Sequence, residues 1–286
     1  MLLRSPVWSS ALFLGGDPLD GDAQPSALLE TRGLKLARNA IHTIADPFVF
    51  AREELYLFAE VQRRKHPGRI EAWQVTPELE PLGELNFASG HMSFPFVFSH
   101  GEDIFILPET SGAAEVALYR FVRFPTKIEK VAVLLKGPFT DSSIVRHEGL
   151  FYLFTSADDK GLLYVGDSID GPYKPHPGSP ISSDQRYLRN AGAILPPSNQ
   201  RPFLIRPVQN CSVSYGGDLS LMKIVELSAH AFSEEPWAED VLTGRYPWCS
   251  TGAHHFSQCE WKGQTVTAVD GRQNDLLVNR ILGLIR

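Results

Sequence analysis

The hydrophobic and polar positions along the chain repeat a single unit. An apolar run at 47–50 follows Asp46, and a second apolar run at 55–59 comes after a polar break. The same order returns at 94–107 and again at 141–155. Short apolar and aromatic runs joined by a few polar residues predict antiparallel strand pairs. The chain is therefore expected to consist of repeated β-hairpins.

The spacing of these hairpins predicts the architecture. The units open at Asp46, Phe94, Asp141 and Ala191, at intervals of 48, 47 and 50 residues, and a fifth begins near His254. Further strand-like runs complete the first four units at 70–75, 116–122, 162–167 and 219–227. A period near 50 residues with about four strands is typical of a propeller blade. The sequence thus predicts an all-β, five-bladed β-propeller with four-stranded blades, the alternative being an irregular β-sandwich.

The segment 1–40 precedes the first repeat. Its apolar run at 11–15 is expected to be a strand that completes the last blade and closes the ring, and 26–40 is expected to hold a short helix or an irregular cover. No low-complexity linker divides the sequence, so we expect a single domain over 1–286.

Composition and charge exclude several classes of function. The net charge is −6 and the sequence has no basic block, which argues against nucleic acid as a partner. No apolar stretch approaches the ~20 residues of a membrane span. Three cysteines without metal-ligand spacing predict neither a disulfide framework nor a zinc site, so we expect a reducing, cytoplasmic compartment.

The repeat brings chemically active side chains together. In a propeller, the first strand of every blade starts at one mouth of the central channel and the second strand returns to it. Equivalent positions therefore converge on a shared funnel. Paired carboxylates at such a place suit glycosidic bond cleavage, because one can protonate the leaving oxygen while the other activates water. The candidate residues in this ring are Asp46, Glu60, His91, Glu109, Asp141, Arg189, Gln209, Tyr215, His255 and Asp270.

Asp46-Pro47 in the first unit and Asp141 in the third resemble the five-bladed hydrolases of glycoside hydrolase family 43. The resemblance implies that Asp46 is a general base, that Asp141 tunes the pKa of the acid, and that a glutamate opening the fourth unit is the acid. Here that place reads Asn-Ala-Gly-Ala at 190–193 and holds no carboxylate. Glu109 is the first substitute for the acid, followed by Glu60 and Asp270.

A closer resemblance covers most of the chain. Six motifs, in one order, are similar to the N-terminal propeller domain of glucosamine inositolphosphorylceramide transferases. They are Ala-Asp-Pro-Phe-Val-Phe at 45–50, His-Met-Ser-Phe-Pro-Phe-Val-Phe at 91–98, Leu-Pro-Glu-Thr at 107–110, Leu-Tyr-Arg at 118–120, Phe-Thr-Asp-Ser-Ser at 139–143 and Gln-Asn-Cys-Ser-Val-Ser-Tyr-Gly at 209–216. This resemblance implies the propeller fold and a role in glycosyl transfer.

Each candidate also has a structural explanation. Asp46 and Asp141 could cap turns, His91 could hydrogen-bond a strand entry, and Arg189 could pair with Asp141 or bind an anionic sugar. Gln209 and Tyr215 could bind sugar hydroxyls. Successive strand residues face opposite sides, so we expect at most one of His254 and His255 to face the axis, where it could hold a water or a central Ca²⁺. No other cofactor is expected.

Two functions remain open at this point. The first is a carbohydrate-active enzyme of glycosidase-like type, with Asp46, Glu109 and Asp141 as its catalytic set. The second is a non-catalytic module that binds a glycan or a sugar nucleotide beside a glycosyltransferase. A purely structural scaffold is disfavoured, because uncompensated carboxylates in a funnel cost stability without serving a purpose.

Overall fold

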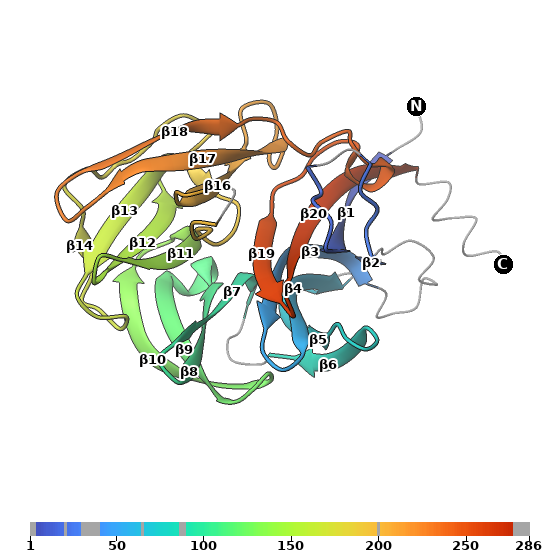
Figure 1. Ribbon diagram of the computed structural model, residues 1–286, viewed down its shortest axis with the longest axis horizontal. Helices are drawn as coiled ribbons and strands as arrows, with labels where there is room; N and C mark the ends of the chain where they lie inside the picture. The colour runs from blue at the N-terminus through green and yellow to red at the C-terminus, as the bar shows by residue number, and fades with distance from the viewer. Residues whose placement is uncertain are drawn as a thin grey trace.

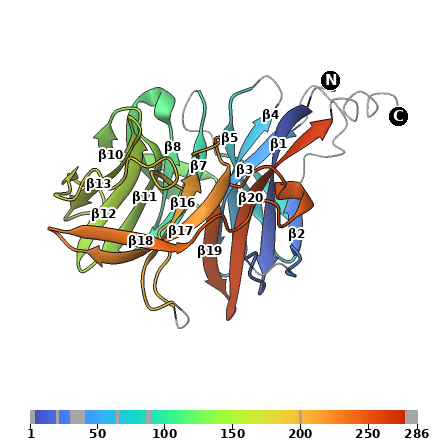
Figure 2. The ribbon, with the colours of Figure 1, turned by 90° about the horizontal axis from the view of Figure 1, so that it is seen from above.

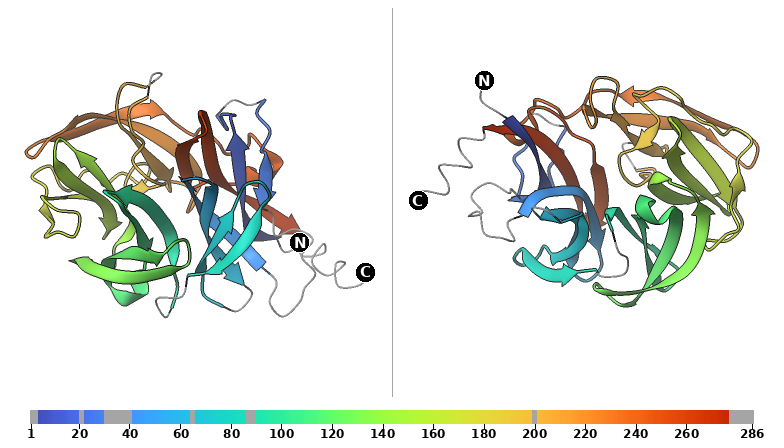
Figure 3. Two further views of the ribbon diagram at one scale, coloured as in Figure 1. Left: turned by 60° about the horizontal axis from the view of Figure 1, so that its bottom comes forward. Right: turned by 180° about the vertical axis from the view of Figure 1, so that it is seen from behind.

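The computed structural model describes residues 4–19, 22–29, 41–63, 66–85, 90–198 and 201–276. Within these residues the chain is almost entirely β-structure, arranged as five four-stranded antiparallel sheets around a common centre (Figures 1–3). This confirms the predicted five-bladed propeller. The blades follow one another along the chain, apart from the last, which joins both ends.

The first three blades are continuous in sequence. Blade 1 contains β3 (Ile41–Ala51), β4 (Leu55–Arg63), β5 (Arg69–Gln74) and β6 (Glu80–Glu84). Blade 2 contains β7 (Ser93–His100), β8 (Asp103–Glu109), β9 (Glu115–Arg123) and β10 (Lys127–Lys136). Blade 3 contains β11 (Thr140–His147), β12 (Leu150–Ala157), β13 (Lys160–Gly166) and β14 (Lys174–Pro175).

Blade 4 contains β15 (Arg189–Asn190), β16 (Ile205–Asn210), β17 (Asp218–Leu227) and β18 (Phe232–Ala238). Blade 5 has the order β19 (Phe256–Trp261), β20 (Gln264–Leu276), β1 (Arg4–Leu14) and β2 (Ala27–Leu29). Two short 3₁₀ turns, Ser111–Ala113 and Pro247–Cys249, complete the described secondary structure.

An N-terminal strand closes the ring, as predicted. Strand β1 pairs with β20 over eleven residues, from Arg4 opposite Leu276 to Leu14 opposite Val266. The observed strand is longer than the predicted run at 11–15. The predicted helix or cover at 26–40 begins instead with β2, and residues 30–40 lie outside the described residues.

Apolar side chains between neighbouring blades form the core. One cluster joins Phe48 of blade 1, Phe94 and Leu107 of blade 2, and Ile144 and Leu153 of blade 3. Strands buried on both faces explain why the sequence shows nearly continuous apolar runs there. Within the described part of the chain, no helix is long and apolar enough to cross a membrane. The three cysteines are free thiols.

A shared irregularity positions the first strands of blades 1 to 3. Asp46, Phe94 and Asp141 all have left-handed backbones, with φ of 51°, 47° and 51°. In each blade the pairing register shifts at this point, between Ala45 and Phe48 in blade 1, for example. A β-bulge re-aims a side chain where it interrupts the ladder. The repeat found in the sequence is therefore a repeat of bulges at one mouth.

Blade 4 differs from the predicted alignment by one residue. Arg189 pairs with Gln209, as Ala45 pairs with Glu60 and Ser93 with Glu109. Asn190, rather than Ala191, is therefore the counterpart of Asp46, and Gln209 is the returning residue that corresponds to Glu60 and Glu109. The one-residue error arose because Gly192, with φ of 147°, gives the fourth unit an irregular entry that apolar spacing does not reveal.

Candidate functional site

Three interblade hydrogen bonds link the carboxylates around the funnel mouth. Asp270 Oδ2 accepts the Asp46 N–H at 3.1 Å, Asp46 Oδ2 accepts the Phe94 N–H at 3.1 Å, and Glu109 Oε2 accepts the Asp141 N–H at 3.0 Å. Each acceptor thus holds the left-handed residue of the next blade. Glu109 lies opposite Ser93, the neighbour of Phe94, in the pairing of β7 with β8. The carboxylates of Asp270, Asp46 and Glu109 therefore follow one another along the mouth, and we call them the carboxylate arc.

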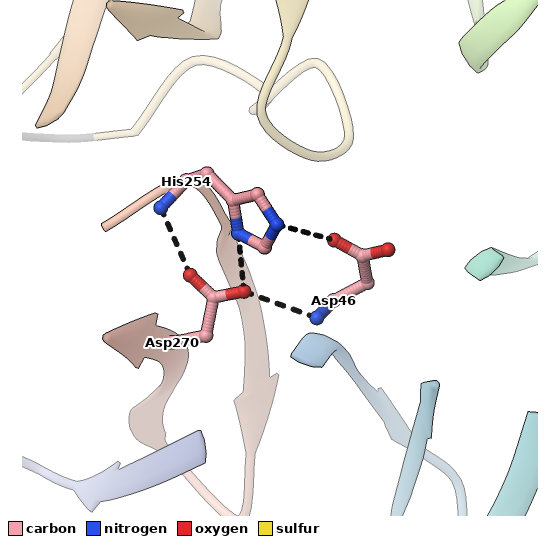
Figure 4. A group of neighbouring side chains, drawn as sticks. All are labelled: Asp46, His254 and Asp270. Carbon is pink, nitrogen blue, oxygen red and sulfur yellow. Dashed lines mark hydrogen bonds and ion pairs between the residues drawn. The ribbon is translucent and has the colours of Figure 1, made fainter. Parts of the chain in front are cut away.

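Asp46, His254 and Asp270 form the innermost cluster (Figure 4). His254 Nδ1 lies 2.6 Å from Asp270 Oδ2, and its Nε2 lies 3.8 Å from Asp46 Oδ1. Burial opposes the charge on His254, but Asp270 and Asp46 outweigh it and raise the pKa of His254 to about 9. His254 is therefore an imidazolium at neutral pH, and it lowers the pKa of Asp270 despite the burial of that carboxylate.

Asp46 is buried, with 6 % of its surface exposed. Burial raises its pKa to about 6, while the charge of His254 opposes this rise. His255 is fully buried beside it, with Nδ1 3.8 Å from Asp46 Oδ1 and its ring packed edge-on against Phe48 and Phe94. Burial lowers the pKa of His255 to about 3. His255 is therefore neutral at neutral pH and lies against Asp46.

Both histidines approach Asp46, contrary to the expected alternation. The reason is that they precede β19, which begins at Phe256, and therefore do not follow strand geometry. Their backbone N–H groups both donate to Asp270 Oδ1, at 2.9 Å each. This turn directs both imidazole rings toward the carboxylate of Asp46.

Asp141 carries a second ion pair. Arg189 Nε and Nη2 each lie 2.7 Å from Asp141 Oδ2, and Gln209 Nε2 donates to the same oxygen at 3.2 Å. The guanidinium stacks over the ring of Tyr215, 5.2 Å from its centroid. Tyr215 is half-exposed and also meets His254 edge-on at 5.4 Å, so it separates the two ion pairs.

Glu60 and Glu109 hold protons at neutral pH. Burial, together with the negative charge of Asp46, raises the pKa of Glu60 to about 8. Burial, together with the charge of Asp141, raises the pKa of Glu109 to about 8, although Arg189 and the Asp141 N–H oppose this. Both side chains retain some exposed surface at the mouth.

His91 and Gly68 hold Glu60 from the side. His91 Nε2 lies 3.5 Å from Glu60 Oε1, and His91 Nδ1 accepts the Gly68 N–H at 3.1 Å. That bond places the ring hydrogen of neutral His91 on Nε2, facing Glu60. A Cβ on Gly68 would overlap Glu60 Oε1 and lie 2.8 Å from His91 Cε1. Only glycine allows this close approach.

Asn190 stands at the opening of blade 4, where the resemblance noted in the sequence led us to expect an acidic residue. Its side chain is buried; Nδ2 donates to the carbonyls of Asp141 at 2.7 Å and Phe154 at 3.1 Å, while Oδ1 accepts from Arg206 at 3.1 Å. Arg206 is itself fully buried and paired with Glu234. Every hydrogen-bonding group of the Asn190 amide is thus used structurally.

A cavity of about 390 Å³ opens beside the carboxylate arc, between blades 3 and 4. Its lining includes Arg189, which is paired with Asp141, and Tyr215, which lies beneath the Arg189 guanidinium. Hydroxyl, amide and carboxylate groups dominate the rest of its polar lining, from Thr140, Ser156, Asp158, Asp159 and Gln185. Its volume falls in the range that holds small ligands.

The family model for the N-terminal region of glucosamine inositolphosphorylceramide transferase 1 matches residues 28–272. The chain belongs to this family. It is 32 % identical over 262 residues to glucosamine inositolphosphorylceramide transferase 1 of Arabidopsis thaliana, covering 84 % of this chain and 34 % of that protein. It is 30 % identical over 247 residues to the protein of the same name in Oryza sativa subsp. japonica, covering 80 % and 33 %. The chain therefore spans about a third of the length of these relatives.

Solved glycoside hydrolases share the fold of this family member. The GH43 protein BlXynB from Bacillus licheniformis superposes with a TM-score of 0.55 at 16 % identity, covering 74 % of this chain and 47 % of that one. RS223-β-xylosidase gives 0.55 at 9 % identity, covering 80 % and 91 %. The family 117 hydrolase Zg3597 of Zobellia galactanivorans gives 0.53 at 10 % identity, covering 93 % and 91 %. At these identities the likeness establishes the fold alone.

A metal could be considered only at Asp46, His254 and Asp270, where possible ligand atoms lie within 4.8 Å of one another among the described residues. A metal would have to displace the proton of His254, and the Asp270 oxygens already accept three backbone N–H groups. Ca²⁺ prefers six or more oxygen ligands. In this family member the three residues supply one imidazole and two carboxylates, so the central Ca²⁺ considered from the sequence stays a prediction.

The predicted site residues of this family member gather at one mouth, although their roles stay predictions. Glu109, Asp141, Arg189, Gln209 and Tyr215 are linked by direct contacts. Sequence reasoning missed Trp8, which stacks on His254 at 3.9 Å, and Gly68. Trp8 comes from the ring-closing strand, outside the repeat that guided the search. Gly68 lies in a loop where only the neighbouring side chains show why glycine is needed.

Proposed function

We propose that the funnel mouth binds a carbohydrate and acts on its anomeric centre in the manner of a glycosidase. The observation that supports this is a pair of carboxyl groups with different proton affinities at one mouth. With pKa values of about 6 and about 8, Asp46 is mostly ionised at neutral pH and Glu109 mostly protonated. A general base and a general acid require these opposite states.

In this proposal each residue has a distinct role. Asp46 removes a proton from the attacking hydroxyl or water, while Glu109 donates one to the leaving oxygen. Asp141 supports the acid, because its charge adds to the rise in the pKa of Glu109. Arg189, Gln209 and Tyr215 orient the sugar, His91 holds Glu60, and His255 acts beside Asp46.

A second candidate is a module that binds a glycan or sugar nucleotide without turnover and serves glycosyl transfer. Asn190 favours it, because the usual acid position is locked into the packing of blade 4. The names of the relatives, which are transferases three times the length of the matched region, also favour it. A cytoplasmic location stays a prediction for either function.

Turnover and binding can be separated with wild type and two variants, Asp46→Asn and Glu109→Gln. A panel of aryl glycosides and glycan fragments is measured for hydrolysis and for binding. Enzymatic action predicts turnover in wild type and a loss of at least about a hundredfold in Asp46→Asn. Asp103→Asn makes the same chemical change at the exposed far end of blade 2 and should retain full turnover.

The outcomes differ between the candidates. Binding in all proteins without turnover in any would select the binding module. Absence of both binding and turnover across the panel would overturn the carbohydrate proposal itself.

A further inference from the structure

A loop of blade 4 forms one wall of the funnel mouth. It joins β16 to β17 over residues 211–217, and residues 212–215 are exposed. Tyr215 of this loop lines the cavity between blades 3 and 4 and meets the His254 ring edge-on at 5.4 Å. The Arg189 guanidinium lies over the same ring at 5.2 Å. Tyr215 is therefore a wall shared by the cavity and the innermost cluster, and its place depends on what holds the loop.

Arg272, on β20 of blade 5, holds this loop across the boundary between the two blades. Its Nη1 donates to the Tyr215 carbonyl at 2.7 Å. Its Nη2 donates to Ser214 Oγ at 3.0 Å and to the Thr251 carbonyl at 2.6 Å. A planar guanidinium suits this task because its N–H groups point in fixed directions. One side chain thus ties the Tyr215 backbone and the Ser214 side chain to the segment that leads into β19.

The Arg272 side chain is in turn supported by blade 5. Arg272 lies opposite Trp8 in the pairing of β20 with β1, and its Cζ lies 5.4 Å from the centre of the Trp8 ring. The Arg272 N–H donates to the Gly252 carbonyl at 2.7 Å, and the Thr251 N–H donates to the Arg272 carbonyl at 2.9 Å. These backbone bonds do not involve the guanidinium. Loss of the guanidinium would therefore free the loop while β20 stays paired.

Joining blade 4 to blade 5 is the alternative explanation for Arg272. A backbone bond already makes this connection at the end of the loop, where the Ala253 N–H donates to the Gly216 carbonyl at 3.1 Å. What the Arg272 side chain adds to the loop is its grip on Ser214 and Tyr215. Its effect is thus directed at the residue that forms the wall.

We propose that Arg272 is a positioning residue of the funnel mouth and acts on the ligand through Tyr215. This inference rests on the carbohydrate-binding function proposed above, in which Tyr215 orients the sugar. With Arg272 in place, the Tyr215 ring stays between Arg189 and His254 and presents one fixed surface. A surface that is ordered before the ligand arrives loses less conformational entropy on binding. Arg272 therefore contributes to affinity from a different blade.

A double-mutant cycle tests this with the same panel of aryl glycosides and glycan fragments. Arg272→Met keeps an aliphatic stem and removes every donor. It should weaken binding of each ligand that wild type binds by about three- to tenfold in isothermal titration calorimetry. In a Tyr215→Ala background the same change should alter binding by less than about twofold, because the residue through which Arg272 acts is gone. A general weakening of blade 5 would instead reduce binding equally in both backgrounds.

Further variants separate positioning from charge and from folding. Arg272→Lys keeps the charge, but one ammonium cannot reproduce the fork, so most of the loss should remain. Ser214→Ala removes an acceptor at an exposed position and should weaken binding only while Tyr215 is present, so it carries the test if Arg272→Met does not fold. Arg245→Met is the matched control. It frees the Leu19 carbonyl on the turn after β1 from a guanidinium and should leave binding unchanged.

Fluorine NMR follows the wall in the free protein. In protein labelled with 3-fluorotyrosine, the Tyr215 resonance is assigned from Tyr215→Phe. It should move toward the position of a solvent-exposed tyrosine in Arg272→Met, because the ring leaves the edges of Trp8 and His254. It should stay in place in Arg245→Met.

The failures of the two proposals are distinguishable. Additive losses in the two backgrounds, full binding in Arg272→Met or Arg272→Lys, or an unmoved Tyr215 resonance would each overturn the positioning role and leave the carbohydrate function standing. Absence of binding by every panel member in wild type would overturn the two together.

Discussion

At the scale of residues, the position of protons decides what the mouth can do. Asp46, Glu60 and Glu109 are all raised in pKa by burial, but His254 limits the rise at Asp46, whereas the charges of Asp46 and Asp141 add to the rise at Glu60 and Glu109. His254 and His255 are adjacent in sequence, yet one is charged and the other neutral, because Asp270 contacts only the first ring closely. Identical residue types thus acquire different chemistry from contacts alone.

The proton on Glu60 has a consequence for stability. Its folded-state pKa of about 8 lies above its ordinary value of 4.5, so protonation favours the folded state. The contribution is complete at acidic pH and is lost as pH rises to about 8. His254 acts in the same direction, since its raised pKa favours the folded state until pH passes about 9. We therefore expect the free energy of unfolding to fall between about pH 5 and about pH 9.

Urea denaturation of wild type and Glu60→Gln across this range measures the effect. The variant should show a shallower decline and exceed wild type in stability above pH 8 by about 1 kcal/mol or more. Parallel pH profiles for the two proteins would contradict the assigned proton.

A second residue-scale prediction concerns Asn190→Asp. The new carboxylate would accept hydrogen bonds where the amide now donates to two buried carbonyls, leaving both unsatisfied. We expect a loss of about 2–4 kcal/mol in the free energy of unfolding, measured with urea. Asn274→Asp, an exposed change on β20, is the control and should cost little. A variant as stable as this control would show that the amide does not hold the two blades.

At the scale of elements, the bulged strand entries explain how far sequence reasoning reached. The openers at Asp46, Phe94 and Asp141 were found because each bulge is flanked by a continuous apolar strand, which leaves a periodic signal. Blade 4 was misaligned because its first strand has only two residues, Arg189 and Asn190, and is followed by an irregular entry at Gly192, so the sequence shows almost no pattern there. The pKa values of the carboxyl groups at the mouth could not be predicted from the sequence, since they depend on contacts between residues of different blades.

Gly68 provides a test at this scale. Gly68→Ala would force a methyl group against Glu60 and His91 at the approach to β5. We expect a loss of about 1–3 kcal/mol in stability from this overpacking, together with altered titration of Glu60 followed by NMR. Gly112→Ala, where an added Cβ meets no atom within 4 Å, is the matched control. An unchanged Glu60 titration in Gly68→Ala would contradict the proposed cradle.

At the scale of the whole molecule, blade 5 holds the ring together. Strand β1 lies between β20 and β2, and Ser10 Oγ donates to the Ile44 carbonyl of blade 1 at 3.1 Å. The same blade supplies His254 and Asp270 of the innermost cluster, as well as Trp8, which stacks on His254. The blade that closes the ring therefore also supplies part of the site.

Removal of residues 1–29 should abolish cooperative folding. The deletion would take away β1 and β2, expose the edge of β20 and strip Ala11 and Phe13 from a buried cluster. Circular dichroism with thermal melting should show no native-like transition for the truncated chain. A sharp melt close to that of the full chain would contradict the role of β1 in closure.

The paired ribbon of β1 and β20 also extends beyond the funnel. Asp270 stands at the mouth opposite Ser10, and the pairing continues for six more residues to Leu276 opposite Arg4. Both described ends of the polypeptide thus leave together on the side of the carboxylates. In the longer relatives, a domain joined at either end would begin its path next to the opening of the funnel. The propeller would then hold an attached domain near the funnel mouth, and the length of the connecting segment would set how far that domain can move away.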